Sequence, residues 1–153
     1  MKKIYLSELE MQICTKIAMQ RRHNDRAAGI DEKYLGKGDG EHRDIQGVCA
    51  EFAVAKMYNL YPDLTTHTRK GGCDLKRNGQ RIDVKQCDRE DGNLIAPIFK
   101  NKHEVDVYIL VTGTNPYSVV GWCKSAELIS RINLRDFGYG PTYYMSRDGL
   151  RSV

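Results

Sequence analysis

GCDLKRNGQRIDVK, residues 72–85, has the pattern of a β-hairpin whose turn is Asn78-Gly79. Both central residues of the favoured two-residue hairpin turn need positive φ, which Asn and Gly tolerate best. With this turn, Asp74 lies opposite Asp83 across the ladder. We therefore expect two antiparallel strands that place a pair of carboxylates side by side.

Strand alternation divides the side chains of this hairpin into two faces. Lys85 lies two residues beyond Asp83, so it projects from the same face as the two aspartates. The opposite face is apolar and suited to burial, and it carries Cys73, Leu75, Ile82 and Val84.

Two aspartates that face each other repel unless a cation or a shared proton relieves the repulsion. Magnesium is bound through one or two carboxylates, while water and phosphate oxygens fill its other positions. The pattern therefore predicts a metal site with Lys85 beside the metal-bound water or the phosphate. The alternative is a solvated polar face on which Lys76 and Arg81 neutralise the carboxylates.

The composition is that of one globular domain. The chain has 153 residues, of which 41% are hydrophobic and 29% charged, and its net charge of +4 is compatible with a polyanionic partner. No apolar run approaches the length needed to cross a bilayer, and the N-terminus turns polar too early for a secretory signal. We expect a cytoplasmic protein with no membrane association.

Cysteine and histidine spacing argues against zinc and disulfides. The five cysteines are widely spaced without a Cys-x-x-Cys pair, and the four histidines lack ligand spacing. We expect the cysteines to be small, largely buried hydrophobic residues in a reducing compartment.

Two helices are expected before the hairpin. A capping box at Ser7–Glu10 opens the first, about residues 7–28, and Gly29 is its expected stop. Its expected inward stripe is Leu9, Ile13 and Ile17. The polar, glycine-rich residues 31–43 are expected to form a surface loop or a lid.

The second helix is expected from about Arg43 to Leu60, where Tyr61-Pro62 ends it. Glu51 lies at the edge of its apolar arc, as either a salt-bridge residue or a site residue. The expected arc consists of Ile45, Val48, Cys49, Phe52 and Ala55.

Strands are expected at residues 64–70, 94–99, 105–111 and 118–123, and the third of these is apolar enough to be an interior strand. Ser125 is expected to cap a short helix that ends near residue 132. The aromatic tail is expected to be irregular. The whole chain predicts one α/β domain.

Glu51, Asp74, Asp83 and Lys85 occur in an order that resembles the PD-(D/E)xK, or restriction-endonuclease-like, nuclease superfamily. The matching segments are GVCAEFA at 47–53 on the helix, GCD at 72–74 and DVKQ at 83–86 on the two strands, and VGW at 120–122. The resemblance implies a mixed central β-sheet flanked by helices. The single nuclease-like domain would have its core at about 41–124, with an N-terminal helix and a C-terminal accessory segment at 125–153.

Two departures from the family pattern stand out. Cys73 replaces the proline in the family's name. The family usually places a helix between its acid-x-Lys strand and the next core strand, whereas residues 88–104 contain Gly92 and Pro97 and look like an added strand or loop.

The resemblance implies a nuclease that hydrolyses DNA phosphodiester bonds with Mg²⁺ or Mn²⁺. Asp74 and Asp83 would hold the metal, which the backbone carbonyl of Val84 would also face. Glu51 would anchor a metal-bound water or a second ion. Lys85 would position the attacking water and stabilise developing negative charge.

Basic residues around the hairpin are expected to contact phosphate rather than read bases. They are Arg69, Lys70, Lys76 and Arg81, and Arg21, Arg22 and Arg26 would extend the basic track. A chain without a separate recognition domain fits structure-selective cutting, or action as a homodimer, better than recognition of a long site.

Three alternatives remain open. RNA could replace DNA as the substrate. A non-catalytic nucleic-acid-binding module on the same fold would bind without turnover, and a protein-interaction domain would use the aspartate pair only as a polar face.

Overall fold

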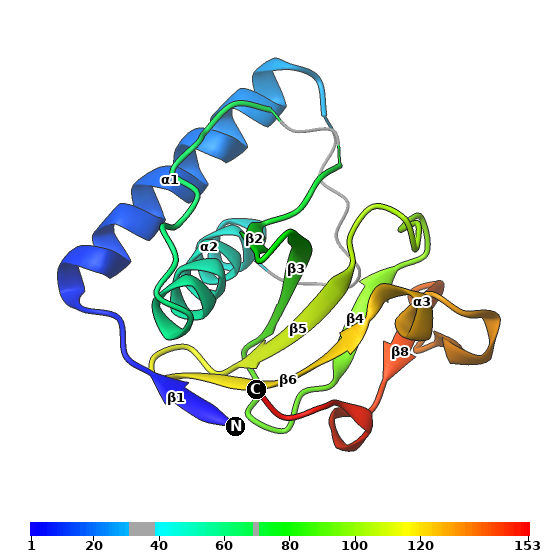
Figure 1. The fold of residues 1–153 in the computed structure, drawn as a ribbon. Coiled ribbons are helices and arrows are strands. Elements are labelled where there is room, and N and C mark those ends of the chain that lie inside the picture. The colour runs from blue at the N-terminus through cyan, green and yellow to red at the C-terminus, as the bar shows by residue number, and fades with distance from the viewer. Residues whose placement is uncertain (31–38, 69–70) are drawn as a thin grey trace.

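A mixed five-stranded sheet lies between two helices and a smaller three-stranded sheet in the computed structural model (Figure 1). The structure describes residues 1–30, 39–68 and 71–153. The strand order is β1-β6-β5-β3-β2 in the large sheet and β4-β8-β7 in the small one, which we call the accessory sheet. The strands are β1 Lys2–Ile4, β2 Leu75–Arg77, β3 Gln80–Cys87, β4 Leu94–Pro97, β5 Val107–Thr112, β6 Tyr117–Lys124, β7 Leu134–Asp136 and β8 Pro141–Met145. The helices are α1 Glu8–Ala27, α2 Gly40–Met57 and α3 Ser125–Leu128.

The first helix begins and ends where local chemistry predicts. Ser7 Oγ accepts from the Glu10 N–H at 3.2 Å while the Glu10 carboxylate accepts from the Ser7 N–H at 2.6 Å, which is the predicted capping box. Gly29 takes φ +71° just past the end of the helix.

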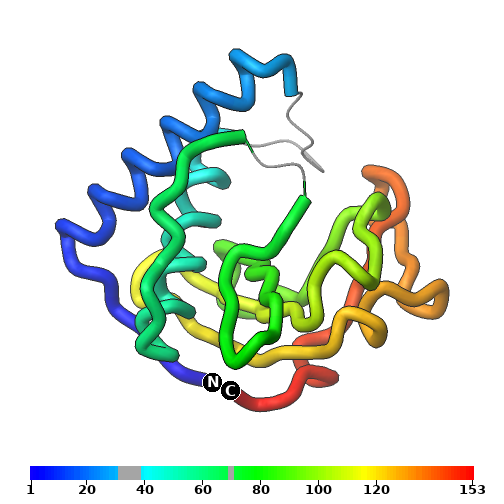
Figure 2. The backbone as a smooth tube through the Cα atoms, turned by 45° about the horizontal axis from the view of Figure 1, so that its top comes forward, coloured from blue at the N-terminus to red at the C-terminus, as the bar shows by residue number. Residues whose placement is uncertain are grey.

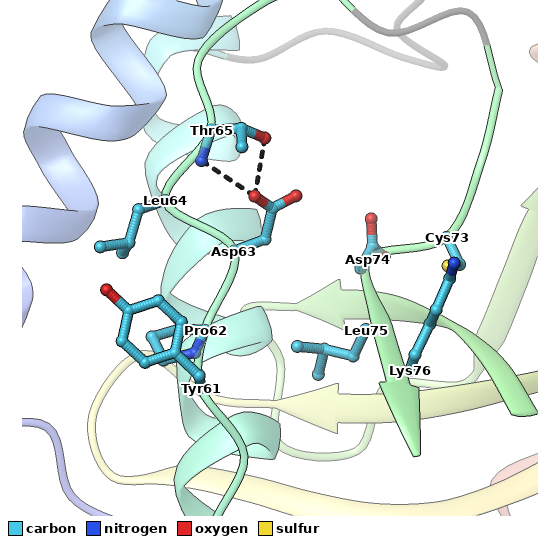
Figure 3. A pocket seen from close by; sticks show the side chains of 9 residues that line it. All are labelled: Tyr61, Pro62, Asp63, Leu64, Thr65, Cys73, Asp74, Leu75 and Lys76. Carbon is cyan, nitrogen blue, oxygen red and sulfur yellow. Dashed lines mark hydrogen bonds between the residues drawn. The ribbon is translucent and has the colours of Figure 1, made fainter. Parts of the chain in front are cut away.

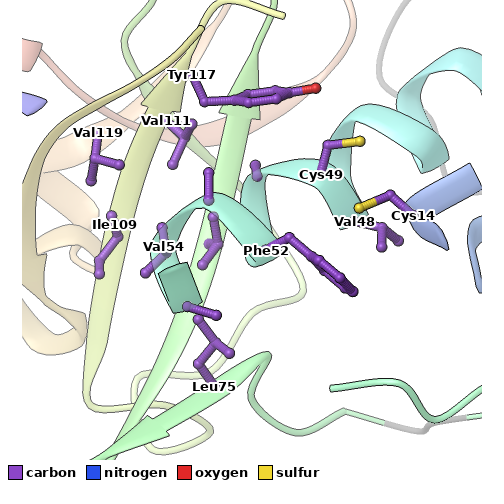
Figure 4. Packing of buried hydrophobic residues seen from close by; sticks show 14 of the residues in the cluster. Cys14, Val48, Cys49, Phe52, Val54, Leu75, Ile109, Val111, Tyr117 and Val119 are labelled. Atoms are coloured by element: carbon purple, nitrogen blue, oxygen red, sulfur yellow. The ribbon is translucent and has the colours of Figure 1, made fainter. Parts of the chain in front are cut away.

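The predicted inward stripe of α1 is wrong in part. Leu9 and Ile13 are exposed, and the buried residues are Cys14, Ile17 and Ala18. Two of these are small, which lets α1 approach α2 closely, and Cys14 lies beside Cys49 in the core (Figure 4). The contact face of α1 therefore carries Cys14, Ile17 and Ala18, and not Leu9 or Ile13.

The second helix is buried on nearly all sides because it lies between α1 and the sheet. Residues 48–50 and 52–55 are all buried, and Figure 4 shows Val54 beside Ile109 of β5. The helix begins three residues earlier than predicted, where the Asp39 side chain accepts from the Glu41 N–H at 3.0 Å. It ends before Asn59, which takes φ +54°.

The hairpin has the predicted register. Asn78 and Gly79 take φ +50° and +79°, and Leu75 pairs with Ile82. Leu75, Ile82 and Val84 pack in the cluster that includes α2, as expected. Cys73 does not join them and packs against the cluster on the other side of the sheet, because β2 begins only at Leu75.

The connection after β3 carries a strand, as the departure from the family pattern indicated. Residues 88–106 contain β4 and no helix, and β4 pairs with β8 in the accessory sheet. The chain then returns as β5, which lies parallel to β3 and is buried at every position, in agreement with the predicted interior strand.

Residues 64–70 were expected to form a strand, and this prediction is wrong for residues 64–68 (Figure 3). Side chains of α1 supply the hydrogen bonds that a neighbouring strand would give. Arg21 donates to the Thr65 carbonyl at 2.9 Å, and Asn24 donates to the Thr66 carbonyl at 2.7 Å. Residues 69–70 lie outside the described residues.

The C-terminal segment is more regular than predicted. Strands β7 and β8 replace the expected irregular tail, and β8 closes the accessory sheet against β4. The helix expected to end near residue 132 ends at Leu128. Ser125 is the first residue of that helix rather than its cap.

The two ends of the described chain lie close together (Figure 2). β1 pairs with residues 117–119 of β6, and Arg151 pairs with Trp122 farther along the same strand. All five cysteines are free thiols. In the described parts of the chain, no helix has the length and apolar character needed to span a membrane.

The approach of the C-terminal segment to β6 predicts the effect of one substitution. A Cβ added at Gly121 would lie 2.6 Å from the Arg151 carbonyl oxygen and 2.8 Å from Leu150 Cβ. We expect Gly121→Ala to lower the free energy of unfolding in urea by about 1–3 kcal/mol, because the segment must shift. Gly47→Ala is the control, since a Cβ there meets no heavy atom within 4 Å. This helix-interior change should raise the stability by up to about 1 kcal/mol, and equal effects of the two changes would contradict the close contact.

Candidate active site

The candidate site is organised around a buried carboxylate on β3. Asp83 is 3% exposed and lies on the sheet face that is turned away from α2, beside Tyr108 of β5. Both of its oxygens accept from ammonium groups. Lys85 Nζ bonds Oδ1, and Lys100 Nζ bonds Oδ2 at 2.9 Å. Burial of an unpaired carboxylate would be costly, so these two cations permit the burial.

Lys85 is where strand alternation predicts it. It lies two residues after Asp83 on the same face, and its ammonium is 5.8 Å from the centre of the Tyr108 ring. The Lys85 side chain is 24% exposed, whereas the Asp83 side chain is 4% exposed. Lys85 therefore connects the buried carboxylate with the surface.

Lys100 is a site residue that the sequence did not reveal. It follows β4, in a turn closed by a 3.1 Å bond from its own N–H to the Pro97 carbonyl. Burial alone would lower the pKa of Lys100, but the negative charges of Asp83, Glu104 and Asp74 outweigh burial and raise this pKa. Only a fold that returns the chain across β3 brings residue 100 to residue 83, and no local sequence signal encodes that contact.

Asp74 directly precedes β2, at the end of the β2–β3 ladder. Its N–H donates to the Ile82 carbonyl at 2.8 Å, and its Oδ2 accepts from the Val84 N–H at 2.7 Å. A side-chain oxygen thus replaces the backbone carbonyl that a longer β2 would offer to β3. The two aspartates are therefore neighbours, as the register predicts, and each carboxylate has its own hydrogen-bond donors.

In the alternative interpretation, Lys76 and Arg81 neutralise the two aspartates. Arg81 does not do so, because it pairs with another carboxylate. The guanidinium of Arg81 forms two hydrogen bonds to the Asp106 carboxylate, at 3.0 and 3.1 Å. These bonds, together with one from the Arg81 N–H, lower the pKa of Asp106 to about 2. Lys76 is exposed beside the turn.

Arg69 and Lys70, the other two expected phosphate contacts, lie outside the described residues, as does most of the expected glycine-rich loop.

Glu51 pairs with an arginine of α1. Its carboxylate accepts from Arg21 Nη1 at 3.1 Å on the helix side of the sheet, and its side chain is 12% exposed. Over the described ranges, no group of three or more His, Cys, Asp or Glu side chains is arranged to hold a metal. The structure thus brings Asp74, Asp83, Lys85 and Lys100 together, and it pairs Glu51 with Arg21.

Two of the three arginines expected to extend the basic track, Arg21 and Arg22, form ion pairs with carboxylates. Arg21 also lies 3.9 Å from Asp63, and Arg22 bonds Asp44 at 2.7 Å. Both arginine side chains are largely buried, at 14% and 13% exposure, so these two residues brace α1 against the chain around α2.

A pocket of about 620 Å³ lies between the segment after α2 and the start of β2 (Figure 3). Asp63 and Asp74 come from its two walls, and Tyr61 lies farther along the same rim. Asp63 also accepts from the Thr65 N–H at 2.9 Å, which fixes this wall. Asp74 therefore faces solvent-accessible space, while Asp83 lies behind the two lysines.

The oxygens of Asp74 and Asp83 are hard donors of the kind that Mg²⁺ and Mn²⁺ prefer. The ammonium group of Lys100 shows that the position beside Asp83 Oδ2 accepts a cation. A divalent ion bound by Asp83 would have to displace the Lys100 ammonium from this oxygen.

Comparison with known proteins places the chain in a family without assigning an activity. A family model described as a family of unknown function, DUF5843, matches residues 2–134, so the chain belongs to this family. No curated protein and no solved structure matches it.

The contact between Asp83 and Lys100 can be measured by a double-mutant cycle. We expect Asp83→Asn and Lys100→Met to show a coupling energy of about 1–3 kcal/mol in urea unfolding, because each change leaves a buried charge with fewer partners. The matched control is Asp91→Asn with Arg89→Met, an ion pair whose side chains are 71% and 77% exposed. Its coupling should stay below about 1 kcal/mol. Equal coupling in the two cycles would mean that Asp83 is not energetically buried.

Proposed function

We propose that this chain is a divalent-metal-dependent nuclease that hydrolyses DNA phosphodiester bonds. One observation carries the proposal: the buried Asp83 carboxylate binds Lys85 on its own strand, next to Asp74 at the start of the neighbouring strand. A fold without a use for this arrangement would gain stability from apolar residues at the same places. Strongly interacting charged groups beside a pocket are typical of active sites.

The fold is compatible with this assignment. The coarse architecture is a curled mixed α/β sheet with helices on one face. The antiparallel β2–β3 hairpin next to the parallel β3–β5 pair supports the finer proposal of a restriction-endonuclease-like core. The accessory sheet would then be an addition to that core.

Asp74 and Asp83 would hold Mg²⁺ or Mn²⁺, and the family resemblance implies the Val84 carbonyl as a further ligand. When bound, the ion would make its water more acidic and polarise the phosphate. Glu51 could take part only after release from Arg21, so we assign it to support of α1 and α2 in the absence of substrate.

Lys85 has the position to act on the reacting atoms. Its ammonium is anchored by Asp83 and its side chain stays partly exposed, so it would stabilise negative charge that develops on the phosphoryl oxygens and orient the attacking water. The hydrogen bond from the Val84 N–H holds Asp74 in place, which lowers the reorganisation needed when substrate binds.

Cleavage of labelled DNA and RNA structures tests the proposal. With Mg²⁺ or Mn²⁺, we expect DNA cleavage that chelator abolishes and that Asp83→Asn and Lys85→Ala each reduce by at least about 100-fold. Glu127→Gln is the control, because Glu127 pairs with Arg151 on α3, away from the two aspartates. Full activity in both site variants would refute the assigned roles, and cleavage of RNA alone would transfer the proposal to RNA.

A non-catalytic nucleic-acid-binding module is the second candidate, and one observation favours it. Both oxygens of Asp83 are already occupied by ammonium groups, which is the arrangement of a structural ion cluster.

Metal binding separates the two candidates. Titration of the protein with Mn²⁺, followed by electron paramagnetic resonance of the free ion, should show a binding site that Asp83→Asn removes and Glu127→Gln retains. A nuclease needs this site, because Asp83 would hold the ion. Absence of Mn²⁺ binding to the wild-type chain, with salt-sensitive DNA binding intact, would establish the second candidate.

A further inference from the structure

A second cavity, of about 370 Å³, begins at Lys85 itself. Lys85 and Leu110 line it from the large sheet, and Ile95 and Tyr144 line it from the accessory sheet. Ile95 and Tyr144 are cross-strand partners of β4 and β8, so one register places both at the cavity. The volume lies within the range of about 300–1,000 Å³ that is typical of small-ligand sites.

Aromatic rings form one wall of this cavity. Phe137 follows β7, and its ring centre lies 5.4 Å from that of Tyr144 with an angle of 57° between the planes. Phe137 is 54% exposed and Ile95 is 40% exposed. Large apolar side chains that are exposed together around a cavity mark a binding surface.

The other walls are polar and carry two basic residues and one acidic residue, Lys85, Arg89 and Asp91. Lys85 contributes its ammonium from the β3 side, and Arg89 lies at the rim, where it pairs with Asp91 at 2.7 Å. The cavity therefore combines aromatic faces with a cation that also belongs to the proposed reaction centre. A strand of nucleic acid offers both complementary groups, because each base is a flat ring and is joined to a phosphate.

We infer that this cavity binds one unpaired nucleobase of the substrate, next to the phosphate that Lys85 contacts. The inference rests on the proposed function and deepens it. A base held against Tyr144, Phe137 and Ile95 must first leave its stack, and this costs least in a single strand, a frayed end or a mismatch. The substrate class is therefore DNA with an unpaired segment at the cleavage position.

Binding in chelator tests this pocket without turnover. The probe is a single-stranded oligonucleotide with one 2-aminopurine, whose fluorescence falls when the base stacks on an aromatic ring. We expect quenching on binding by the wild-type chain, with affinity about tenfold lower in Phe137→Ala and Tyr144→Ala, because stacking of one base is worth about 1–3 kcal/mol. Tyr144→Phe should keep both quenching and affinity.

Tyr139→Ala is the matched control, because Tyr139 is an exposed tyrosine in the same turn and does not line the cavity. Phe137→Leu separates stacking from apolar burial: it should retain the thermal midpoint of the wild-type chain and lose the quenching. A blunt duplex of the same sequence should bind at least tenfold more weakly than the single strand.

Two results would overturn the inference: equal affinity for single strand and duplex, or equal effects of Phe137→Ala and Tyr139→Ala. If the wild-type chain does not cleave DNA but still quenches 2-aminopurine, the nuclease proposal would be refuted and the base pocket would stand. Cleavage that is unaffected by Phe137→Ala and Tyr144→Ala, with no quenching, would refute the pocket and keep the nuclease. In that case the exposed aromatic surface would be a protein contact.

Discussion

The burial of one negative charge governs the arrangement of this chain around its candidate site. Asp83 lies on the second strand of a hairpin and is covered on the side of the accessory sheet. Such a charge is tolerated only with close partners of opposite sign. One partner comes from its own strand and the other from the long connection between β3 and β5, so the ion cluster fastens that connection to the sheet. The accessory sheet is built on the same connection, since β4 belongs to it.

Features that depend on neighbours in sequence were predictable. The turn at Asn78-Gly79 determines which residues of β2 and β3 face each other, and that register holds in the structure. The capping box at Ser7 is equally local. The interior strand was evident because β5 is apolar at nearly every position, as a strand covered on both faces must be.

Features that depend on distant contacts were not predictable. Residues 64–68 contain three threonines and resemble a strand, but side chains of α1 bond the carbonyl groups of Thr65 and Thr66. The glycines around Pro141 suggested an irregular tail, whereas β8 forms because β4 provides a partner. Glu51 lies on the predicted helix, but its bond to Arg21 joins two distant parts of the chain and had no local sequence signal. Lys100 had no local signal at all.

The contact of Lys100 with Asp83 would couple ion binding at Asp83 to the position of the connection between β3 and β5. If the proposed divalent ion binds Asp83, it would compete with the Lys100 ammonium for the same carboxylate oxygen, and each would weaken the binding of the other by the same factor. Whatever orders residues 97–104 against the sheet would then act as a negative effector of ion binding. Conversely, an ion at Asp83 would release a tether of the accessory sheet, so the mobility of that sheet would report whether an ion occupies the proposed site.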